Sequence, residues 1–192
     1  MPDPNPAALE FLLTRRSRPA KTLTGPAPSR QELLPILQAA MRSPDHGKLE
    51  PWRLIVLEAA ALDRLAALVA DTGARLERSA EDIAKMTDQF ARAELAVAVI
   101  EVQKPSPKVP AIEQSYSAGA VCLALLNAAL ASGWGANWLS GWASHDRAFA
   151  TQALGLAENE RIAGFIHIGT ETNAPPERPR PALEAITEWV SE

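Results

Sequence analysis

Alternation between short apolar runs and amphipathic stretches divides this chain into predicted strands and helices. The runs Trp52–Glu58 and Leu95–Val102 are short, apolar and contain several β-branched residues, which predicts strands. Leu95–Val102 is continuously apolar, as expected for a strand covered on both faces. A third predicted strand is Arg161–Thr170. Helical periodicity predicts helices over Pro6–Arg16, Arg30–Arg42, Ala61–Leu76, Glu81–Arg92, Ile112–Ser132 and His145–Leu154.

The ends of the first two predicted helices carry signals of their own. Asn5 and Ser29 stand immediately before these helices, and both residue types accept hydrogen bonds from the free N–H groups of a first helical turn. Pro44 follows the second helix and ends it, because proline has no amide hydrogen to donate. These signals support the helix assignments independently of the periodicity.

The order of these elements predicts an α+β domain with a central mixed or antiparallel sheet flanked by helices. A chain of 192 residues is long enough for one domain with a substantial core and too short for two, so we expect a single domain over residues 1–192. Residues 103–110, QKPSPKVP, form a proline-bearing loop before the longest helix. Residues 183–190 are compatible with either a terminal helix or a strand.

Composition narrows the classes of partner. A net charge of −4 argues against nucleic acid or an anionic membrane, because binding to either needs clustered Lys and Arg. The single cysteine, Cys122, lies in an apolar helical run and is expected to be a buried thiol. The chain does not begin like a signal peptide, and the apolar run 118–131 is shorter than the roughly 20 residues that span a bilayer. We therefore expect a cytoplasmic protein.

Familiar catalytic motifs are absent from the sequence. It contains neither a G-x-G-x-x-G fingerprint after a strand, nor a phosphate-binding P-loop, nor a G-x-S-x-G nucleophile elbow. His46, His145 and His167 are far apart and no cysteine cluster accompanies them, so no metal site is expected. We predict no catalytic side chain, and this absence points to a cofactor that performs the difficult chemical step.

Residues 14–18, TRRSR, place Arg15, Arg16 and Ser17 at the end of the first predicted helix. Two interpretations are open at this point. Cations in a last helical turn interact favourably with the helix dipole. Alternatively, the guanidinium groups bind a phosphate and the serine hydroxyl adds a further hydrogen bond.

A polar segment, DHGKLE, stands between Pro44 and Pro51 and separates the second helix from the first strand. Asp45 is suited to capping a turn there. His46 and Glu50 stand in this polar segment, so they are either solvated loop side chains or functional groups. The two prolines indicate that the backbone geometry of this loop matters.

Residues 133–142, GWGANWLSGW, combine tryptophans with glycines. One interpretation is a packed turn that leads into a strand. The other is a binding site for a flat ligand, in which aromatic rings form walls and the glycines allow close approach of the backbone.

Taken together, these segments resemble the FMN-dependent nitroreductase family, in particular its small single-domain bacterial branch. The matching segments occur in the order found in that family. RRSR ends the first helix, and residues 27–58 form a unit of helix, loop and strand. Residues 108–141 resemble the central helix and the strand after it, and IAGFIHIGT at residues 162–170 resembles the last core strand. The resemblance extends over residues 15–170.

The resemblance implies an interlocked homodimer with one FMN in each of two clefts at the subunit interface. Arg15, Arg16 and Ser17 would hold the phosphate together with part of the ribityl chain and the pyrimidine edge. His46 and Glu50 would approach the flavin from the partner subunit. A glutamine is more usual at the position of Glu50, and a carboxylate there disfavours an anionic reduced flavin unless it is protonated or paired with a cation.

The resemblance also assigns the tryptophan segment. Trp138, Leu139 and Ser140 would line the isoalloxazine ring, whereas Trp134 and Trp142 are expected in the core or at the subunit interface. Larger family members hold the phosphate with basic residues after the last strand. Residues 178 and 180, both arginines, have a suitable spacing for this role but are equally compatible with an exposed tail.

The implied activity is a ping-pong oxidoreductase reaction. NADH or NADPH would pass a hydride to the flavin N5, and a nitroaromatic or quinone acceptor would then be reduced in the same cleft. The loop 103–110 is a candidate gate for this cleft. Three alternatives stay open: an FMN sensor or storage protein, a relative that uses oxygen to cut the flavin, and a helical partner-binding protein without a cofactor.

Overall fold

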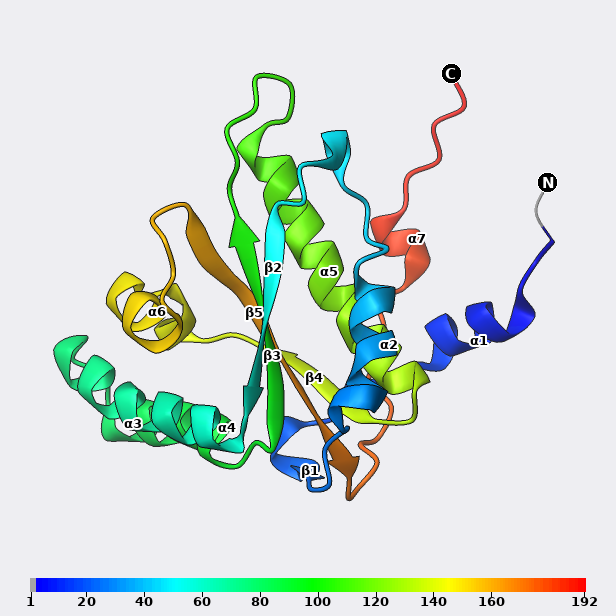
Figure 1. Cartoon of the computed structure of the whole chain (residues 1–192). Coiled ribbons are helices and arrows are strands. Elements are labelled where there is room, and N and C mark those ends of the chain that lie inside the picture. Colours follow the sequence, from blue (N-terminus) through cyan, green and yellow to red (C-terminus); the bar gives the residue numbers. More distant parts are fainter. Residues whose placement is uncertain (1–2) are drawn as a thin grey trace.

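Within residues 3–192, which the computed structural model describes, five strands form one antiparallel sheet at the centre of the molecule (Figure 1). The strands are β1 (Leu23–Thr24), β2 (Trp52–Glu58), β3 (Leu95–Val102), β4 (Gly135–Leu139) and β5 (Glu160–Glu171). β5 pairs with β3 and with β4, β3 pairs with β2, and β1 pairs with the end of β5. The expected α+β architecture is confirmed, and every strand pair is antiparallel.

The apolar runs predicted the positions of the central strands well. β2 and β3 have the predicted bounds, and β5 extends one residue beyond the predicted strand at each end. A register shift between Val99 and Ile100 interrupts the ladder that joins β3 to β5. The two-residue strand β1 was missed, because so short a segment shows no periodicity.

Helices account for most of the remaining chain. They are α1 (Pro6–Thr14), α2 (Arg30–Ala40), α3 (Ala59–Arg75), α4 (Ala80–Ala91), α5 (Ala111–Ala131), α6 (Arg147–Leu154) and α7 (Leu183–Ile186). Short 3-10 helices are η1 (Ala20–Thr22), η2 (His46–Lys48) and η3 (Trp142–His145). The tail segment left open by the sequence thus forms one short helix.

The predicted helix caps are present. The side chain of Asn5 accepts a hydrogen bond from the amide of Ala8 at 3.1 Å. Ser29 and Glu32 form a reciprocal capping box, in which the Glu32 carboxylate accepts from the Ser29 amide at 2.8 Å. Each cap satisfies N–H groups that have no partner within the helix.

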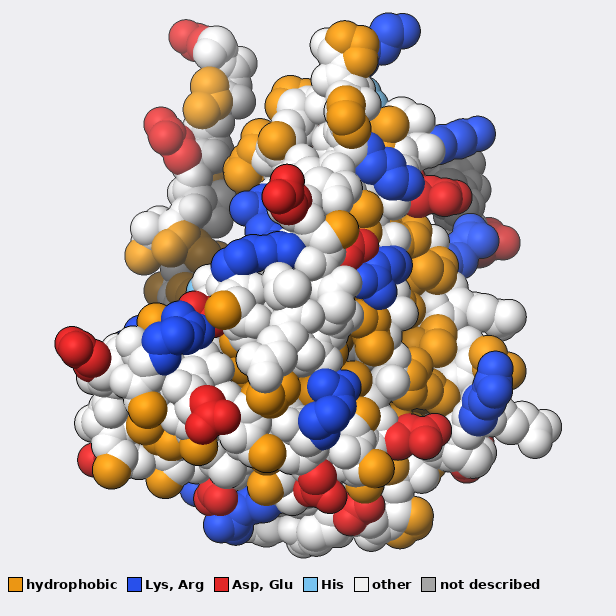
Figure 2. Space-filling model, turned by 60° about the vertical axis from the view of Figure 1, so that its left-hand side comes forward, with side chains coloured by type: hydrophobic (Ala, Val, Ile, Leu, Met, Phe, Trp, Pro, Cys, Tyr) orange, Lys and Arg blue, Asp and Glu red, His pale blue; other side chains and the backbone are white. Residues whose placement is uncertain are grey.

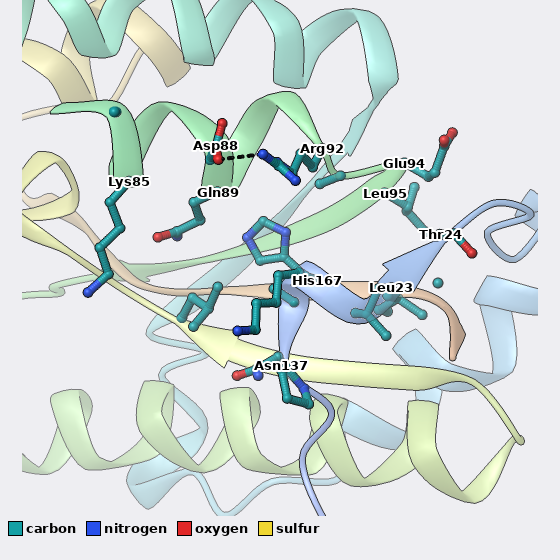
Figure 3. A pocket seen from close by; sticks show the side chains of 18 of the residues that line it. Leu23, Thr24, Lys85, Asp88, Gln89, Arg92, Glu94, Leu95, Asn137 and His167 are labelled. Atoms are coloured by element: carbon teal, nitrogen blue, oxygen red, sulfur yellow. Dashed lines mark ion pairs between the residues drawn. The ribbon is translucent and has the colours of Figure 1, made fainter. Parts of the chain in front are cut away.

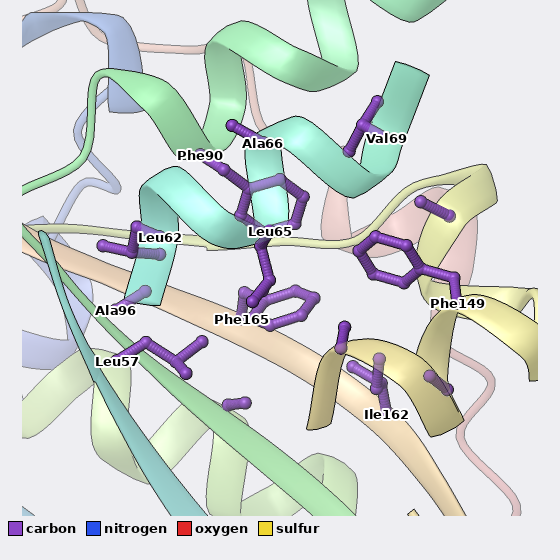
Figure 4. Packing of buried hydrophobic residues seen from close by; sticks show 14 of the residues in the cluster. Leu57, Leu62, Leu65, Ala66, Val69, Phe90, Ala96, Phe149, Ile162 and Phe165 are labelled. Carbon is purple, nitrogen blue, oxygen red and sulfur yellow. The ribbon is translucent and has the colours of Figure 1, made fainter. Parts of the chain in front are cut away.

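Helices cover both faces of the sheet (Figure 1). On one face, α3, α4 and α6 pack over a core that contains Phe90, Phe149 and Phe165 (Figure 4). On the other face, α2 and α5 cover a second core with Val97 and Val99 of β3. Neighbouring residues of β3 point to opposite faces and both faces are covered, which explains why the strand is continuously apolar.

The outer surface is mixed in charge. In the face turned toward the viewer in Figure 2, Lys and Arg side chains are interspersed with Asp and Glu side chains and with hydrophobic ones. A surface of this kind is ordinary for a globular domain, in which apolar atoms also contribute much of the accessible area.

By length and composition alone, α5 could cross a membrane. It packs instead on α2 and on the sheet, which is the position of a core helix in a globular domain. Cys122 on this helix is fully buried, and burial raises the pKa of its thiol to about 12. The prediction of a buried thiol is therefore confirmed, and the thiol has no thiolate character near neutral pH.

Candidate functional site

The arginines of RRSR lie in an extended segment after α1. The helix ends at Thr14, so interpreting these arginines as cations in a last helical turn is wrong. The amide of Arg18 donates to the carbonyl of Ala136 at 2.8 Å, and the side-chain amide of Asn137 donates to the carbonyl of Arg18 at 2.6 Å. These two hydrogen bonds fix the segment along β4.

The guanidinium groups of Arg15 and Arg16 converge on Ser17. Nη2 of Arg15 donates to the Ser17 hydroxyl at 2.7 Å, and Nη1 of Arg16 donates to the Ser17 carbonyl at 3.3 Å. The Nε atoms of both arginines are buried and have no hydrogen-bond partner among the residues that the structure describes. Buried N–H donors normally have a hydrogen-bond partner, so these two Nε atoms are suited to bind an acceptor from a ligand.

Several positive charges meet at this point. Burial lowers the pKa of Arg15, and repulsion from Arg180, Arg16 and Arg18 lowers it further. Arg18 is neutralised in part by Glu171 at 3.0 Å, and Arg180 by Glu177 at 2.9 Å. Of the two tail arginines, Arg180 is thus the one whose charge acts on Arg15. We call Arg15, Arg16, Ser17, Arg18 and Arg180 the arginine cluster.

A cavity of about 750 Å³ lies between α4 and the strands β1, β4 and β5 (Figure 3). The chain that carries the arginine cluster continues directly into its wall at Pro19, Ala20 and Lys21. Apolar lining comes from Leu23, Leu95, Leu139 and Ile168, and polar lining includes Lys85, Gln89, Asn137 and His167. A mostly apolar cavity of this size with a few polar groups is typical of a small-molecule site.

Two polar side chains of this cavity lack partners. His167 is 2% exposed, and neither of its ring nitrogens has a hydrogen-bond partner in the described part of the chain. Burial lowers the pKa of His167 to about 4, so the imidazole is neutral at pH 7. Nε2 of Gln89 is likewise buried and without a partner. At the rim, Arg92 pairs with Asp88 at 2.8 Å (Figure 3).

The tryptophan segment is divided between the two faces of the sheet. Leu139 lines the cavity, whereas Trp138 and Ser140 do not. The indole of Trp138 lies against Gly164 of β5, where a Cβ atom would collide with it. Because side chains alternate along a strand, the neighbours Trp138 and Leu139 point to opposite faces. Of these three residues, only Leu139 therefore lines this cavity in the described chain, and the placement of all three beside a flavin stays a prediction.

Gly135 and Gly141 of this segment serve close packing, whereas Gly133 has a φ of 85°, which residues with a side chain rarely adopt. A Cβ atom at Gly135 would lie 2.5 Å from the Leu23 side chain and 3.2 Å from the Gly169 carbonyl. Trp134 and Trp142 pack partly buried against the two cores, as expected. The interpretation as a packed turn leading into a strand therefore accounts for much of this sequence.

Asp45 organises the polar loop after α2. Its carboxylate accepts hydrogen bonds from the amide of Leu49 at 3.1 Å and from the amide of Glu50 at 2.8 Å. Lys48 and Glu50 have φ angles of 54° and 48°, in the left-handed region that residues with a side chain rarely adopt. The prediction that Asp45 caps a turn is confirmed, and its carboxylate holds this strained backbone.

The same loop is attached to α5. Nδ1 of His46 lies 2.5 Å from the Glu113 carboxylate, and the Ser117 hydroxyl donates to the Pro44 carbonyl at 2.6 Å. His46 and Glu50 do not line the cavity described above. They lie instead with α5, and both side chains are exposed.

Residues 103–110 do not contribute to the cavity either. They follow Val102 at one end of β3, whereas the cavity is lined by Leu95 at the other end. The side chain of Gln114 holds the loop, because it accepts from the Lys104 amide at 2.8 Å and donates to the Lys104 carbonyl at 2.9 Å. A gate over the cavity of the same chain is therefore excluded for this loop in the described conformation.

The fold and the site define an α+β domain with a small-molecule cavity and, on the segment that leads into its wall, a cluster of arginines. A sequence profile described as the nitroreductase family matches residues 12–170. The chain is 36% identical over 163 residues to the Putative NAD(P)H nitroreductase YdjA of Escherichia coli, covering 85% of this chain and 87% of that protein. This chain therefore belongs to the nitroreductase family, and its relatives bear the names of NAD(P)H oxidoreductases.

Solved structures share the fold at lower sequence identity. A nitroreductase-like family protein from Bacillus cereus superposes with a TM-score of 0.79 at 22% identity, covering 99% of this chain and 98% of that one. A nitroreductase from Desulfovibrio desulfuricans, solved in complex with FMN, gives a TM-score of 0.76 at 23% identity, covering 99% and 100% of the two chains. The nitroreductase-like fold is thus confirmed.

Proposed function

We propose that this protein is an FMN-dependent NAD(P)H oxidoreductase that reduces nitroaromatic and quinone-type acceptors in a ping-pong cycle. The observation that carries the proposal is the arginine cluster, whose two buried Nε donors have no partner within the described residues, on the segment that continues into the cavity wall at residues 19–21. A phosphate monoester supplies both the charge and the acceptors that this cluster lacks. The names of the relatives, and the FMN complex of the Desulfovibrio protein, support this assignment.

The residues present match the parts of FMN. Arg15, Arg16 and Arg180 would hold the phosphate, and the Ser17 hydroxyl, oriented by Arg15, would bond to the phosphate or the ribityl chain. Leu139 would contact the ring system in the cavity. When bound, FMN supplies two-electron hydride transfer between a nicotinamide donor and an acceptor. The chain itself excludes water from the cavity and aligns the reactants.

Exposed apolar side chains support an interlocked homodimer. α1 buries none of its residues within its own chain, although Leu9, Leu12 and Leu13 are on it. In the tail, Trp189 is 91% exposed, and Tyr116 and other apolar residues of α5 are also exposed. A short helix without tertiary packing is marginal in water, so a second chain is needed to cover it. In such a dimer, His46 and Glu50 would approach the partner's flavin.

An absorption spectrum of the purified protein tests the function. A flavin band that NADH or NADPH bleaches without oxygen, and that returns when a nitroaromatic is added, supports the proposal. A flavin band that neither donor bleaches favours the sensor or storage alternative, and loss of flavin during aerobic reduction favours a flavin-cutting relative. A colourless protein that takes up no added FMN contradicts the assignment.

Light scattering tests the dimer separately. The wild-type chain is expected at twice its monomer mass, and a Leu12→Glu, Leu13→Glu variant is expected to dissociate. A monomeric wild-type protein that still binds FMN would contradict the interlocked dimer without touching the flavin assignment.

A further inference from the structure

His167 is a polar residue at a position that the sheet normally fills with an apolar one. It lies in β5 opposite Ala96 of β3 and Asn137 of β4, so strands surround it on both sides. Its ring points from β5 toward α4 and forms part of the cavity wall (Figure 3). Phe90 lies on one side of it, with ring centroids 6.4 Å apart.

The hydrogen-bonding capacity of this imidazole is unused. A neutral imidazole carries one N–H donor and one acceptor nitrogen, and neither ring nitrogen has a partner in the described residues. The unpaired Gln89 amide lines the same cavity. Buried polar groups that the chain itself leaves unpaired are normally satisfied by water or by a ligand.

The charges around His167 leave the imidazole in its neutral form. Burial is the cause of its low pKa, and no ion pair with a carboxylate offsets it among the described residues. Lys21 and Lys85 line the cavity together with Glu81 and Glu94, and Arg92 is already paired with Asp88, so charges of both signs face it. A neutral imidazole at this place suits an uncharged part of a ligand that offers carbonyl oxygens and ring nitrogens.

We infer that His167 contacts the bound flavin through a hydrogen bond and raises both its affinity and its reduction potential, which rests on the proposed function of the cavity. The direction of the change in reduction potential follows from electrostatics. A reduced flavin is richer in electrons than an oxidised one, so an N–H donor stabilises the reduced form more strongly. Loss of the donor therefore favours the oxidised form.

The test compares His167→Phe, which keeps an aromatic ring, with His167→Gln, which keeps a donor and an acceptor. FMN is titrated into each apoprotein, and the reduction potential of each complex is measured. His167→Phe is expected to weaken FMN binding about tenfold and to lower the potential by about 30 mV, the equivalent of a tenfold change for two electrons. His167→Gln retains most of both properties. His145→Phe, at an exposed histidine away from the cavity, is the matched control and changes neither.

A second measurement needs no substitution. In wild-type protein labelled with ¹⁵N-histidine, addition of FMN is expected to shift a ring-nitrogen resonance of His167 and to leave that of His145 unchanged. This NMR measurement tests the inference even if His167→Phe does not fold. If wild-type protein binds FMN but the resonance, affinity and potential do not respond, the inference is wrong and the proposed function stands. If wild-type protein does not bind FMN, both are wrong.

Discussion

The two polar segments that the sequence singled out, residues 15–18 and residues 45–50, differ in how far the chain satisfies their side chains. In the first, the buried Nε donors of Arg15 and Arg16 have no partner among residues 3–192, and both burial and nearby like charges lower the pKa of Arg15. In the second, the Asp45 carboxylate accepts two amides and His46 is paired with Glu113. The family resemblance assigned both segments to the flavin.

This difference indicates that one segment binds a ligand and that the other forms a fixed surface without one. An unsatisfied cationic cluster is costly for the free protein and becomes favourable only when an anion arrives. A loop whose hydrogen bonds are complete is stable without a ligand and presents a fixed surface. We therefore assign the arginine cluster to ligand binding within its own chain, and the loop at residues 45–50 to a preformed surface on α5.

The largest effect is expected at the arginine cluster. The double substitution Arg15→Gln, Arg16→Gln removes charge-assisted hydrogen bonds worth about 1.5–3 kcal/mol each, so the Kd for FMN should rise by about 100-fold or more. Apoprotein stability should not fall, because the substitution relieves like-charge repulsion. Calorimetric titration and thermal unfolding measure the two quantities. Arg42→Gln, at an exposed arginine after α2, serves as the control, and a loss of apoprotein stability without a loss of affinity would assign the arginines to folding alone.

His167, which is also buried without a hydrogen-bond partner in the described residues, makes the stability of the apoprotein depend on pH. The pKa of His167 is about 4 in the folded chain, against about 6.5 when unfolded, so the unfolded chain binds a proton first as the pH falls. The free energy of unfolding of the apoprotein should decrease by about 3 kcal/mol between pH 6.5 and pH 4, and this contribution should level off below pH 4. Urea unfolding at each pH measures it.

The His167→Gln variant should lack this slope. Carboxylates with lowered pKa values, Glu101, Asp146 and Glu160, add a loss of stability that begins near pH 5 and continues to lower pH, so the variant and the wild-type protein are compared most cleanly between pH 6.5 and about pH 5. An unchanged slope between pH 6.5 and pH 4 in the variant would show that His167 is not buried as a neutral group.

For the loop at residues 45–50, we expect a substitution to lower stability without a large loss of FMN affinity. Asp45→Ala removes both acceptors that hold Glu50 and Leu49, and it should lower the free energy of unfolding by about 1–3 kcal/mol. The free energy of unfolding of Asp45→Asn, which keeps one acceptor oxygen, should lie between those of the wild-type protein and of Asp45→Ala. Chemical denaturation measures the effect, and a wild-type stability in Asp45→Ala would mean that the loop conformation does not depend on this carboxylate.

The smallest effect is expected for His46→Gln. The His46 side chain is 60% exposed and that of Glu113 is 41% exposed, so the hydrogen bond between them is solvent-screened and contributes at most about 1 kcal/mol. Stability should therefore change little. A loss of several kcal/mol in thermal unfolding would indicate that the loop depends on this contact more than on Asp45.

The sequence predicted the elements better than the cavity. Periodicity located β2 and β3 to the residue, and Asp45 was identified as a cap, because these features depend on neighbours in the chain. Arg180 joins the cluster only through the path of the tail, which no local pattern encodes. The side chains of Trp138 and Leu139 point to opposite faces of the sheet, a detail that the resemblance alone did not give, and their placement beside one flavin stays a prediction.

The polar cavity residues were missed for a related reason. Lys85 and Gln89 are spaced by four on α4, which looks the same in sequence as a solvated helix face. His167 stands in an otherwise apolar strand, and such a position was the one local signal that could have identified it. A polar residue within a buried strand therefore deserves a functional interpretation even when no motif surrounds it.

The most direct measurement compares FMN with riboflavin, which has the same ring system and ribityl chain but no phosphate. The Kd of each is measured for the wild-type apoprotein and for the Arg15→Gln, Arg16→Gln variant. We expect wild-type protein to bind FMN at least 100-fold more tightly than riboflavin, and the variant to bind the two with similar Kd values. Equal binding of FMN and riboflavin by the wild-type protein would contradict the assignment of the arginine cluster to the phosphate.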